Sequence, residues 1–229
     1  MATTQFVGAM RRLLVASLAA LLLVSGGCET REEASRRRRI ERLISKLRSE
    51  DADTSVQAAV AIGNKGPDAR RAIPALIEAL SRKEGAVRRH AAYALGKMGP
   101  AARDAVPHLE KLLKDEDAVA RVWAVQALVR IDPQARPHVD VIVQALGHSD
   151  PGVRINAAGA VELIGHRAEA AVPALIAGLE DRQFRRHAAR ALGSIGPAAR
   201  DAIEPLRRLA DGSDIDAVAA REALKKIRG

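Results

Sequence analysis

Six histidines and one cysteine are the side chains of this 229-residue chain best suited to chemistry. The histidines are His90, His108, His138, His148, His166 and His187. A metal site built on paired His-Glu dipeptides is not expected, because no such dipeptide occurs and the nearest approach, His108-Leu109-Glu110, occurs once. No Ser-His-Asp spacing, phosphate-binding loop or glycine-rich fingerprint stands out either. The sequence therefore predicts a protein that is not an enzyme and that uses no metal and no cofactor.

The single cysteine, Cys28, ends a pattern typical of an export signal. Arg11 and Arg12 precede an unbroken apolar run, Leu13–Val24, and small residues then lead to Cys28. The run matches the apolar region of a secretory signal and falls short of the roughly 20 residues that span a bilayer. A lone cysteine allows neither a disulfide nor a thiolate metal site within the chain. We expect residues 1–27 to be a signal peptide.

Residues 1–28 resemble the signal of bacterial lipoproteins, in which the cysteine is lipidated and becomes the first residue of the mature protein. That family usually has leucine three residues before the cysteine, where this chain has Ser25. The resemblance implies lipidation of Cys28, export, and a lipid anchor on the periplasmic side of a membrane of the bacterial cell envelope. An ordinary cleaved signal and an uncleaved anchor are the alternatives.

The charge of the chain is concentrated near this signal. The net charge is +9, and residues 29–48 alone hold eight basic and four acidic residues. Residues 28–39 are polar and basic, which predicts a tether without a packed core. Arg36 to Arg39 either assist attachment to an anionic membrane surface or form a solvated linker.

The body of the chain is a repeated pattern of helix-forming residues. Five similar segments begin at Ala58, Ala91, Ala124, Ala157 and Ala188, and the sequence GPAARDA occurs at both 99–105 and 196–202. The spacings are 33, 33, 33 and 31 residues, which is a length typical of stacked helical repeats. Aromatic residues make up only 2%, as suits a core of small side chains between closely packed helices.

Each unit reads as a helix A, a tight turn and a helix B. In the second unit helix A is expected to bury Val87, Ala91, Leu95 and Met98, and helix B to bury Val106, Leu109, Leu112 and Leu113. Gly99-Pro100 provides the turn, since glycine tolerates a left-handed C-cap and proline suits the first helical turn. Half units at 40–47 and 216–228 frame the array, so we predict an all-α solenoid of about 12 helices over residues 40–229.

Charged residues repeat with the same period. The acids are Asp51, Glu84, Asp117, Asp150 and Asp181, and the arginines are Arg88, Arg121, Arg154 and Arg185. Each acid stands where a helix A needs its N-cap. Each arginine follows an acid by four residues and can meet that acid or the acid of the next repeat. We interpret this set as a structural ladder along the stack.

The pattern V-R-x-x-A-A-x-A-L-G-x-[IM]-G-P, seen at 87–100 and nearly so at 153–165 and 184–197, resembles short HEAT-like repeats, the type first named for phycobilisome lyases. The resemblance covers residues 40–228. It implies an α-α superhelix of the HEAT/armadillo kind in which B helices line the concave face. It does not imply lyase activity, because this repeat type also occurs in proteins that are not enzymes.

These observations predict a monomeric, membrane-tethered scaffold that binds a protein or peptide on the concave helix-B face. The exposed candidates for that contact are Arg71, Glu78, His108, Lys111, Gln144 and Arg208. A nucleic acid partner is not expected, because neighbouring acids offset the row of arginines near the start of the B helices and the chain is exported. The alternative function is an enzyme or accessory factor resembling HEAT-like bilin lyases. Trp123 is expected to cover a neighbouring repeat rather than to anchor a partner.

Overall fold

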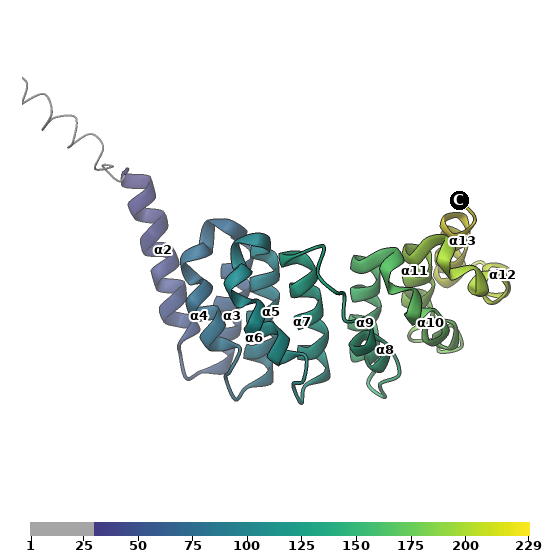
Figure 1. The fold of residues 1–229 in the computed structure, drawn as a ribbon, viewed down its shortest axis with the longest axis horizontal. Helices are drawn as coiled ribbons and strands as arrows, with labels where there is room; N and C mark the ends of the chain where they lie inside the picture. The colour runs from purple at the N-terminus through teal and green to yellow at the C-terminus, as the bar shows by residue number, and fades with distance from the viewer. Residues whose placement is uncertain (1–29) are drawn as a thin grey trace, which may run out of the picture. The chain divides into compact units, whose positions relative to one another are not determined.

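The computed structural model describes residues 30–229, and all regular structure in that range is helical. The chain divides into a unit that ends at Glu41 and a second unit, Arg42–Gly229, that contains the repeats. The described residues form twelve α-helices, labelled α2 to α13 in Figure 1, which agrees with the expected all-α solenoid of about 12 helices.

The repeats alternate long A helices with shorter B helices. The A helices are α3 (Ala52–Gly63), α5 (Gly85–Met98), α7 (Ala118–Ile131), α9 (Pro151–Ile164), α11 (Arg185–Ile195) and α13 (Ile215–Arg228). The B helices are α4 (Ile73–Ala79), α6 (Val106–Leu112), α8 (Val139–Leu146), α10 (Val172–Gly178) and α12 (Ile203–Ala210). Four B helices are preceded by a 3₁₀ segment: η1 (Gly66–Ala72), η2 (Gly99–Ala105), η3 (Gly165–Ala171) and η4 (Gly196–Ala202).

Helix α2 (Arg31–Leu47) begins well before Ile40, where the helix start was expected. The reason is a capping box that sequence analysis missed. The Thr30 amide donates to the Glu33 carboxylate at 2.8 Å, and the Glu33 amide donates to the Thr30 hydroxyl at 3.1 Å. Such reciprocal bonds satisfy two amides at a helix start. The basic segment 31–39 is therefore helical in the structure rather than irregular.

The two faces expected to be buried in the second unit are found at the core. Val87, Ala91, Leu95 and Met98 of α5 are at most 1% exposed. On α6, Leu109 and Leu112 are buried, whereas Val106 and Leu113 are only partly covered. The helix periodicity therefore located the core correctly, with the edges of the B face less enclosed than expected.

The turn between the two helices depends on glycine. Gly66, Gly99, Gly165 and Gly196 all have positive φ, between 54° and 73°. At Gly99 the ψ angle of −141° lies outside the left-handed helical region that was expected, yet it too is accessible without strain only to glycine. Asp132 replaces this glycine in the third unit, where no 3₁₀ segment forms before α8.

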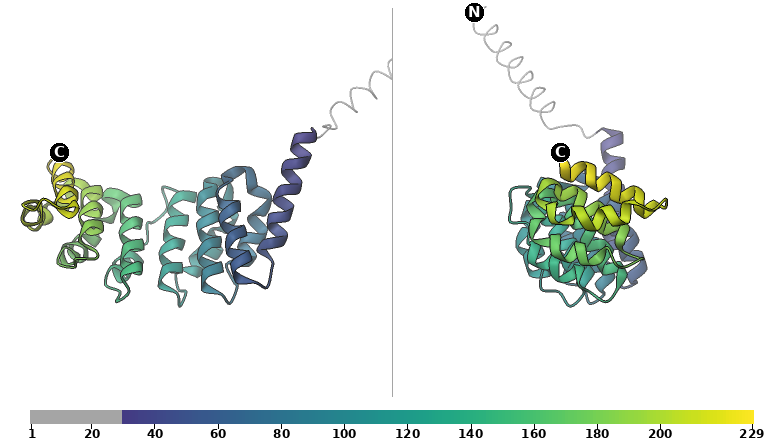
Figure 2. Two further views of the ribbon diagram at one scale, coloured as in Figure 1. Left: turned by 180° about the vertical axis from the view of Figure 1, so that it is seen from behind. Right: turned by 90° about the vertical axis from the view of Figure 1, so that its right-hand side faces the viewer.

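Glycine also sets how closely successive A helices pack. A Cβ placed on Gly63, Gly96 or Gly193 would lie 2.9–3.0 Å from the Cα of Ala94, Ala127 or Ala223 on the next A helix. Backbones can approach so closely only where neither helix has a large side chain at the contact. The same position carries Val129 and Glu162 in the third and fourth units. Figures 1 and 2 show α7 and α9 more widely spaced than α5 and α7.

The last full unit is two residues shorter, and this changes the start of its A helix. Asp181 was expected at the N-cap of that helix, but the N-cap of α11 is Phe184. The Asp181 carboxylate instead accepts a hydrogen bond from the Gln183 amide at 2.8 Å, within the turn that precedes the helix. The N-cap prediction was therefore wrong for this acid.

The shortened start also leaves one ring nitrogen of His187 without a hydrogen-bond partner in the described part of the chain. At the equivalent position, His90 Nδ1 lies 2.7 Å from the Ala86 carbonyl four residues earlier. In α11 the residue four positions before His187 precedes the helix, and the buried His187 Nδ1 atom has no hydrogen-bond partner among the described residues. Burial, with Arg186 and Arg190 nearby, lowers the pKa of His187 below 6.5.

We expect this histidine to make folding stability depend on pH. Because its pKa is lower folded than unfolded, the unfolded chain binds more protons, so stability is present at pH 7 and falls as the pH drops through about 6.5. In His187→Gln the difference in urea midpoint between about pH 7 and pH 5.5 should shrink. His166→Gln, an exposed site on η3, is the matched control; an equal shrinkage there would contradict the assignment.

Candidate functional site

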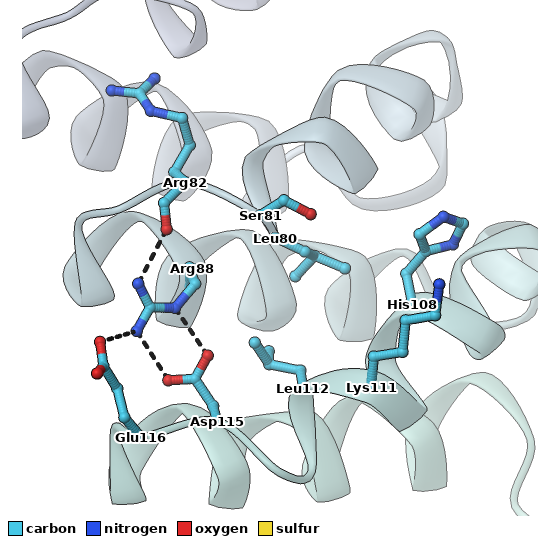
Figure 3. A pocket seen from close by; sticks show the side chains of 9 residues that line it. All are labelled: Leu80, Ser81, Arg82, Arg88, His108, Lys111, Leu112, Asp115 and Glu116. Atoms are coloured by element: carbon cyan, nitrogen blue, oxygen red, sulfur yellow. Dashed lines mark hydrogen bonds and ion pairs between the residues drawn. The ribbon is translucent and has the colours of Figure 1, made fainter.

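A cavity of about 470 Å³ opens between the B helices α4 and α6 (Figure 3). Its lining residues are Leu80, Ser81, Arg82, Arg88, His108, Lys111, Leu112, Asp115 and Glu116. They come from the segment that follows α4, from α5, from α6 and from the loop that follows α6. Two neighbouring repeats thus build one cavity, and neither repeat contains it alone.

One wall of the cavity is a buried ion pair. Arg88 is 7% exposed, and its Nε and Nη2 atoms donate to the two carboxylate oxygens of Asp115, both at 2.8 Å. Glu116 accepts a further bond from Nη2 at 3.3 Å. Hydrogen bonding to Asp115 raises the pKa of the Arg88 guanidinium. Since its donors are occupied, Arg88 shapes the wall rather than offering a free charge to a ligand.

The opposite side of the cavity combines an apolar floor with a rim of basic side chains. Leu80 and Leu112 are each 5% exposed, whereas His108 and Lys111 of α6 are exposed. No ion pair joins Lys111 to an acid within residues 30–229. The cavity suits a ligand segment in which an apolar side chain contacts the leucine floor and an adjacent acidic side chain meets the rim.

The cavity shows no arrangement for nucleophilic catalysis. Ser81 and His108 both line it, but no hydrogen bond connects them in the described structure. No group of three or more His, Cys, Asp or Glu side chains in the described part of the chain is placed to hold a metal ion.

The other predicted contact residues lie away from this cavity. Arg71 of η1, Gln144 of α8 and Arg208 of α12 are exposed on separate repeats. Glu78 of α4 is exposed and pairs with Arg48, with bonds of 3.0 and 3.1 Å. Of the six candidates, only His108 and Lys111 line this cavity.

The ladder acids serve mainly as helix caps. Asp51, Asp117 and Asp150 each accept a hydrogen bond from an amide in the first turn of the following A helix. Glu84 stands at the N-cap of α5 without such a bond. The first four acids therefore occupy the cap position, as the spacing predicted.

The ladder arginines differ in the acidic residues with which they pair. Arg154 bonds to Asp181 of the next repeat at 2.5 Å, which is one of the expected pairings. Arg88 reaches Asp115, two residues before the ladder acid Asp117, and Arg185 lies 3.9 Å from Asp216. Arg121 has no acid within ion-pair distance in residues 30–229. A uniform acid–arginine ladder is therefore wrong in detail, because the loop before each A helix offers acids at different positions.

Three of these arginines also bond to backbone carbonyls, an interaction that sequence analysis missed. Nη1 of Arg88, Arg121 and Arg154 donates in each case to two carbonyls, six and five residues earlier, in the loop after the B helix. Ser55, which replaces arginine in the first unit, donates to the Ser49 carbonyl at 2.9 Å. Carbonyls in such loops have no partner within a helix, so they need donors of this kind. The sequence did indicate these bonds, because an arginine recurs at a fixed distance from each loop.

Cys28 and the preceding signal lie outside the described residues, so the structure does not test lipidation. Within residues 30–229, no helix is long and apolar enough to cross a membrane.

Comparison with solved structures places the fold among helical repeat proteins. An engineered protein matches with a TM-score of 0.62 and 25% identity over 82% of this chain and 98% of that one. The complex of CpcE and CpcF of phycocyanin lyase from Nostoc sp. PCC7120 matches with a TM-score of 0.53 and 26% identity over 79% and 74% of the two chains.

A designed armadillo repeat protein in complex with the peptide (KR)4 also matches, with a TM-score of 0.59 and 17% identity, over 81% of this chain and 98% of that one. At that identity the likeness shows the fold alone. No curated protein matches the chain.

The family model for HEAT repeats matches residues 40–129, 106–183 and 139–225. These ranges together cover α3 through most of α13, and they coincide with the region in which A and B helices alternate. The chain belongs to the HEAT repeat family.

Proposed function

We propose that this protein is a non-catalytic scaffold that binds a segment of a partner protein at the B-helix cavity between α4 and α6. The observation that carries the proposal is the composition of that cavity: a floor of Leu80 and Leu112, a wall whose charges are paired, and a rim with exposed His108 and Lys111. Binding sites of this kind combine an apolar pocket with a few polar groups that fix orientation. A designed armadillo neighbour holds a peptide, which supports a peptide-binding use of the fold.

The second part of the proposal is the location of the protein in the cell. Cys28 follows an apolar run and small residues, so the scaffold is exported and held by a lipid at Cys28 on a membrane of the bacterial envelope. An anchored scaffold meets its partner at the membrane surface. The rival function, a lyase-like enzyme or accessory factor, is favoured by the likeness to the CpcE and CpcF complex.

One experiment in a bacterial host tests both parts. The full chain carries a photo-crosslinking amino acid at Lys111, and the cells are fractionated after irradiation. We expect a discrete adduct in the membrane fraction for the wild-type signal, and release of the protein from membranes in Cys28→Ala. Gly27→Ala, which keeps a small residue before the cysteine, should remain membrane-bound.

The adduct must depend on the cavity. A crosslinker at Ala101, exposed in η2, is the matched control and should give no such adduct, and adding Leu112→Asp should remove it from position 111. Equal adducts at both positions would contradict the cavity assignment. Membrane attachment that survives Cys28→Ala would contradict the anchor, and a cytoplasmic protein would favour the lyase-like function.

A further inference from the structure

We propose a second binding surface, on the A helices α5 and α7, that takes an acidic protein segment. We call it the aromatic–cationic patch. It consists of His90, Tyr93 and Lys97 of α5 and Trp123, Gln126 and Arg130 of α7. This surface goes beyond the proposed function, because the cavity described above lies between B helices. The two A helices pack side by side in the stack (Figures 1 and 2).

The aromatic part of the patch is held rigidly. The Trp123 ring lies 5.1 Å from the His90 ring, edge-on, and 5.7 Å from the Tyr93 ring, measured between centroids. Its Nε1 atom donates to Asn156 Oδ1 of α9 at 2.8 Å. Trp123 thus covers the neighbouring repeat as expected, yet it and Tyr93 remain only half-buried. The only Trp and the only Tyr of the chain therefore meet on one accessible surface.

The cationic part has no anion. Lys97 is exposed and Arg130 is half-buried, and neither lies within ion-pair distance of a carboxylate in residues 30–229. The hydrogen bond seen for Arg130 runs from Nη1 to Gln126 Oε1 at 3.4 Å. Burial lowers the pKa of the Arg130 guanidinium, and the nearby Tyr93 offsets this only in part.

Two arginines of the A helices outside the patch are paired with acids. Arg89 of α5 lies 3.1 Å from Asp117, and Arg190 of α11 bonds to Glu162 at 2.9 Å. The patch contains two fixed cations and no acid among its six residues. A carboxylate arriving beside Tyr93 and Trp123 supplies the missing anion to Arg130 and Lys97, and the planar guanidinium can accept it through two parallel hydrogen bonds.

A protein segment fits this surface better than a membrane. Attachment to anionic lipid by charge uses clusters of about 4–8 Lys or Arg residues, whereas the patch has two. The Trp123 ring is held between α5 and α9 by contacts on both sides, so it does not project as a membrane-inserting side chain would. Carboxylates with an adjacent apolar side chain match both the cations and the rings.

The sole tryptophan of the chain reports directly on the patch. We would titrate the full chain with a synthetic peptide of repeated Glu-Leu-Asp-Gly and follow the emission of Trp123. We expect a saturating change that weakens with added salt. Arg130→Gln and Lys97→Gln should each weaken binding about tenfold or more, since each removes a charge-assisted contact. Lys97 is exposed, so its variant keeps the test valid even if Arg130→Gln folds poorly.

Three controls decide the result. Arg190→Gln removes an A-helix arginine outside the patch and should leave the affinity unchanged. A Lys-Leu-Lys-Gly peptide should produce no change in emission, and vesicles containing anionic phosphatidylglycerol should change the Trp123 emission no more than neutral vesicles do. A flat titration with the acidic peptide, an equal loss in Arg190→Gln, or a change in Trp123 emission with anionic vesicles alone would each overturn the proposal.

Discussion

Gly96→Val is expected to lower the free energy of unfolding by about 3 kcal/mol or more, as overpacking of a tight contact does. The Cβ alone would lie 2.9 Å from the Cα of Ala127 and 3.2 Å from its Cβ. The nearest atom belongs to the backbone of α7, so no side-chain rotation can relieve the clash, and α5 and α7 must move apart. Urea unfolding followed by far-UV circular dichroism measures the loss.

The matched control is Gly159→Val in α9, where nothing lies within 4 Å of an added Cβ. Valine has a slightly better helix propensity than glycine, so this change should alter stability by no more than about 0.5 kcal/mol. The same substitution, in the same kind of helix, thus separates the helix–helix contact from helix propensity. Similar losses at the two sites would mean that the close approach at Gly96 contributes little.

Arg88→Met is expected to destabilise the protein by about 3–5 kcal/mol, the range seen when one partner of a buried ion pair is removed. The Asp115 side chain is only 11% exposed, and it would be left charged without its bidentate partner. The carbonyls of Arg82 and Lys83 would also lose the donor that Arg88 provides. The change in thermal midpoint and urea midpoint measures both losses together.

Two comparisons isolate the ion pair from the carbonyl bonds. Arg121 occupies the same repeat position but donates only to carbonyls, so Arg121→Met should cost about 1–2 kcal/mol. In the double variant Arg88→Met with Asp115→Asn, the unpaired charge is gone and much of the stability should return. A double variant no more stable than Arg88→Met would show that the carbonyl bonds carry the effect.

Local sequence patterns predicted the helices and their buried faces because those features depend on a few neighbouring residues. The spacing of Val87, Ala91 and Leu95 fixed the core face of α5, and Gly99 marked its end. The start of α2 was missed for a correctable reason, since Thr30 and Glu33 form a recognisable capping box. The wrong N-cap at Asp181 reflects a two-residue shortening whose effect on the turn the spacing alone does not reveal.

The candidate site was predictable only in part. Exposure of His108 and Lys111 followed from helical periodicity, but the cavity depends on how far apart α4 and α6 stand. That separation is set by packing between repeats. The aromatic–cationic patch illustrates the same limit, because Tyr93 and Trp123 are 30 residues apart and meet only after α5 and α7 pack. Periodicity locates faces, whereas sites arise where faces of different repeats meet.

The glycine contacts between A helices have a mechanical consequence. Each repeat touches mainly its neighbours, so the stiffness of such an array is set interface by interface. We expect the stack to be stiffest where Gly63, Gly96 and Gly193 let the backbones of successive A helices approach closely. Between α7 and α9, where Val129 takes the glycine position, the Trp123–Asn156 bond links helices that stand further apart. We expect this interface to deform more readily than those with the glycine contacts, and the aromatic–cationic patch lies beside it.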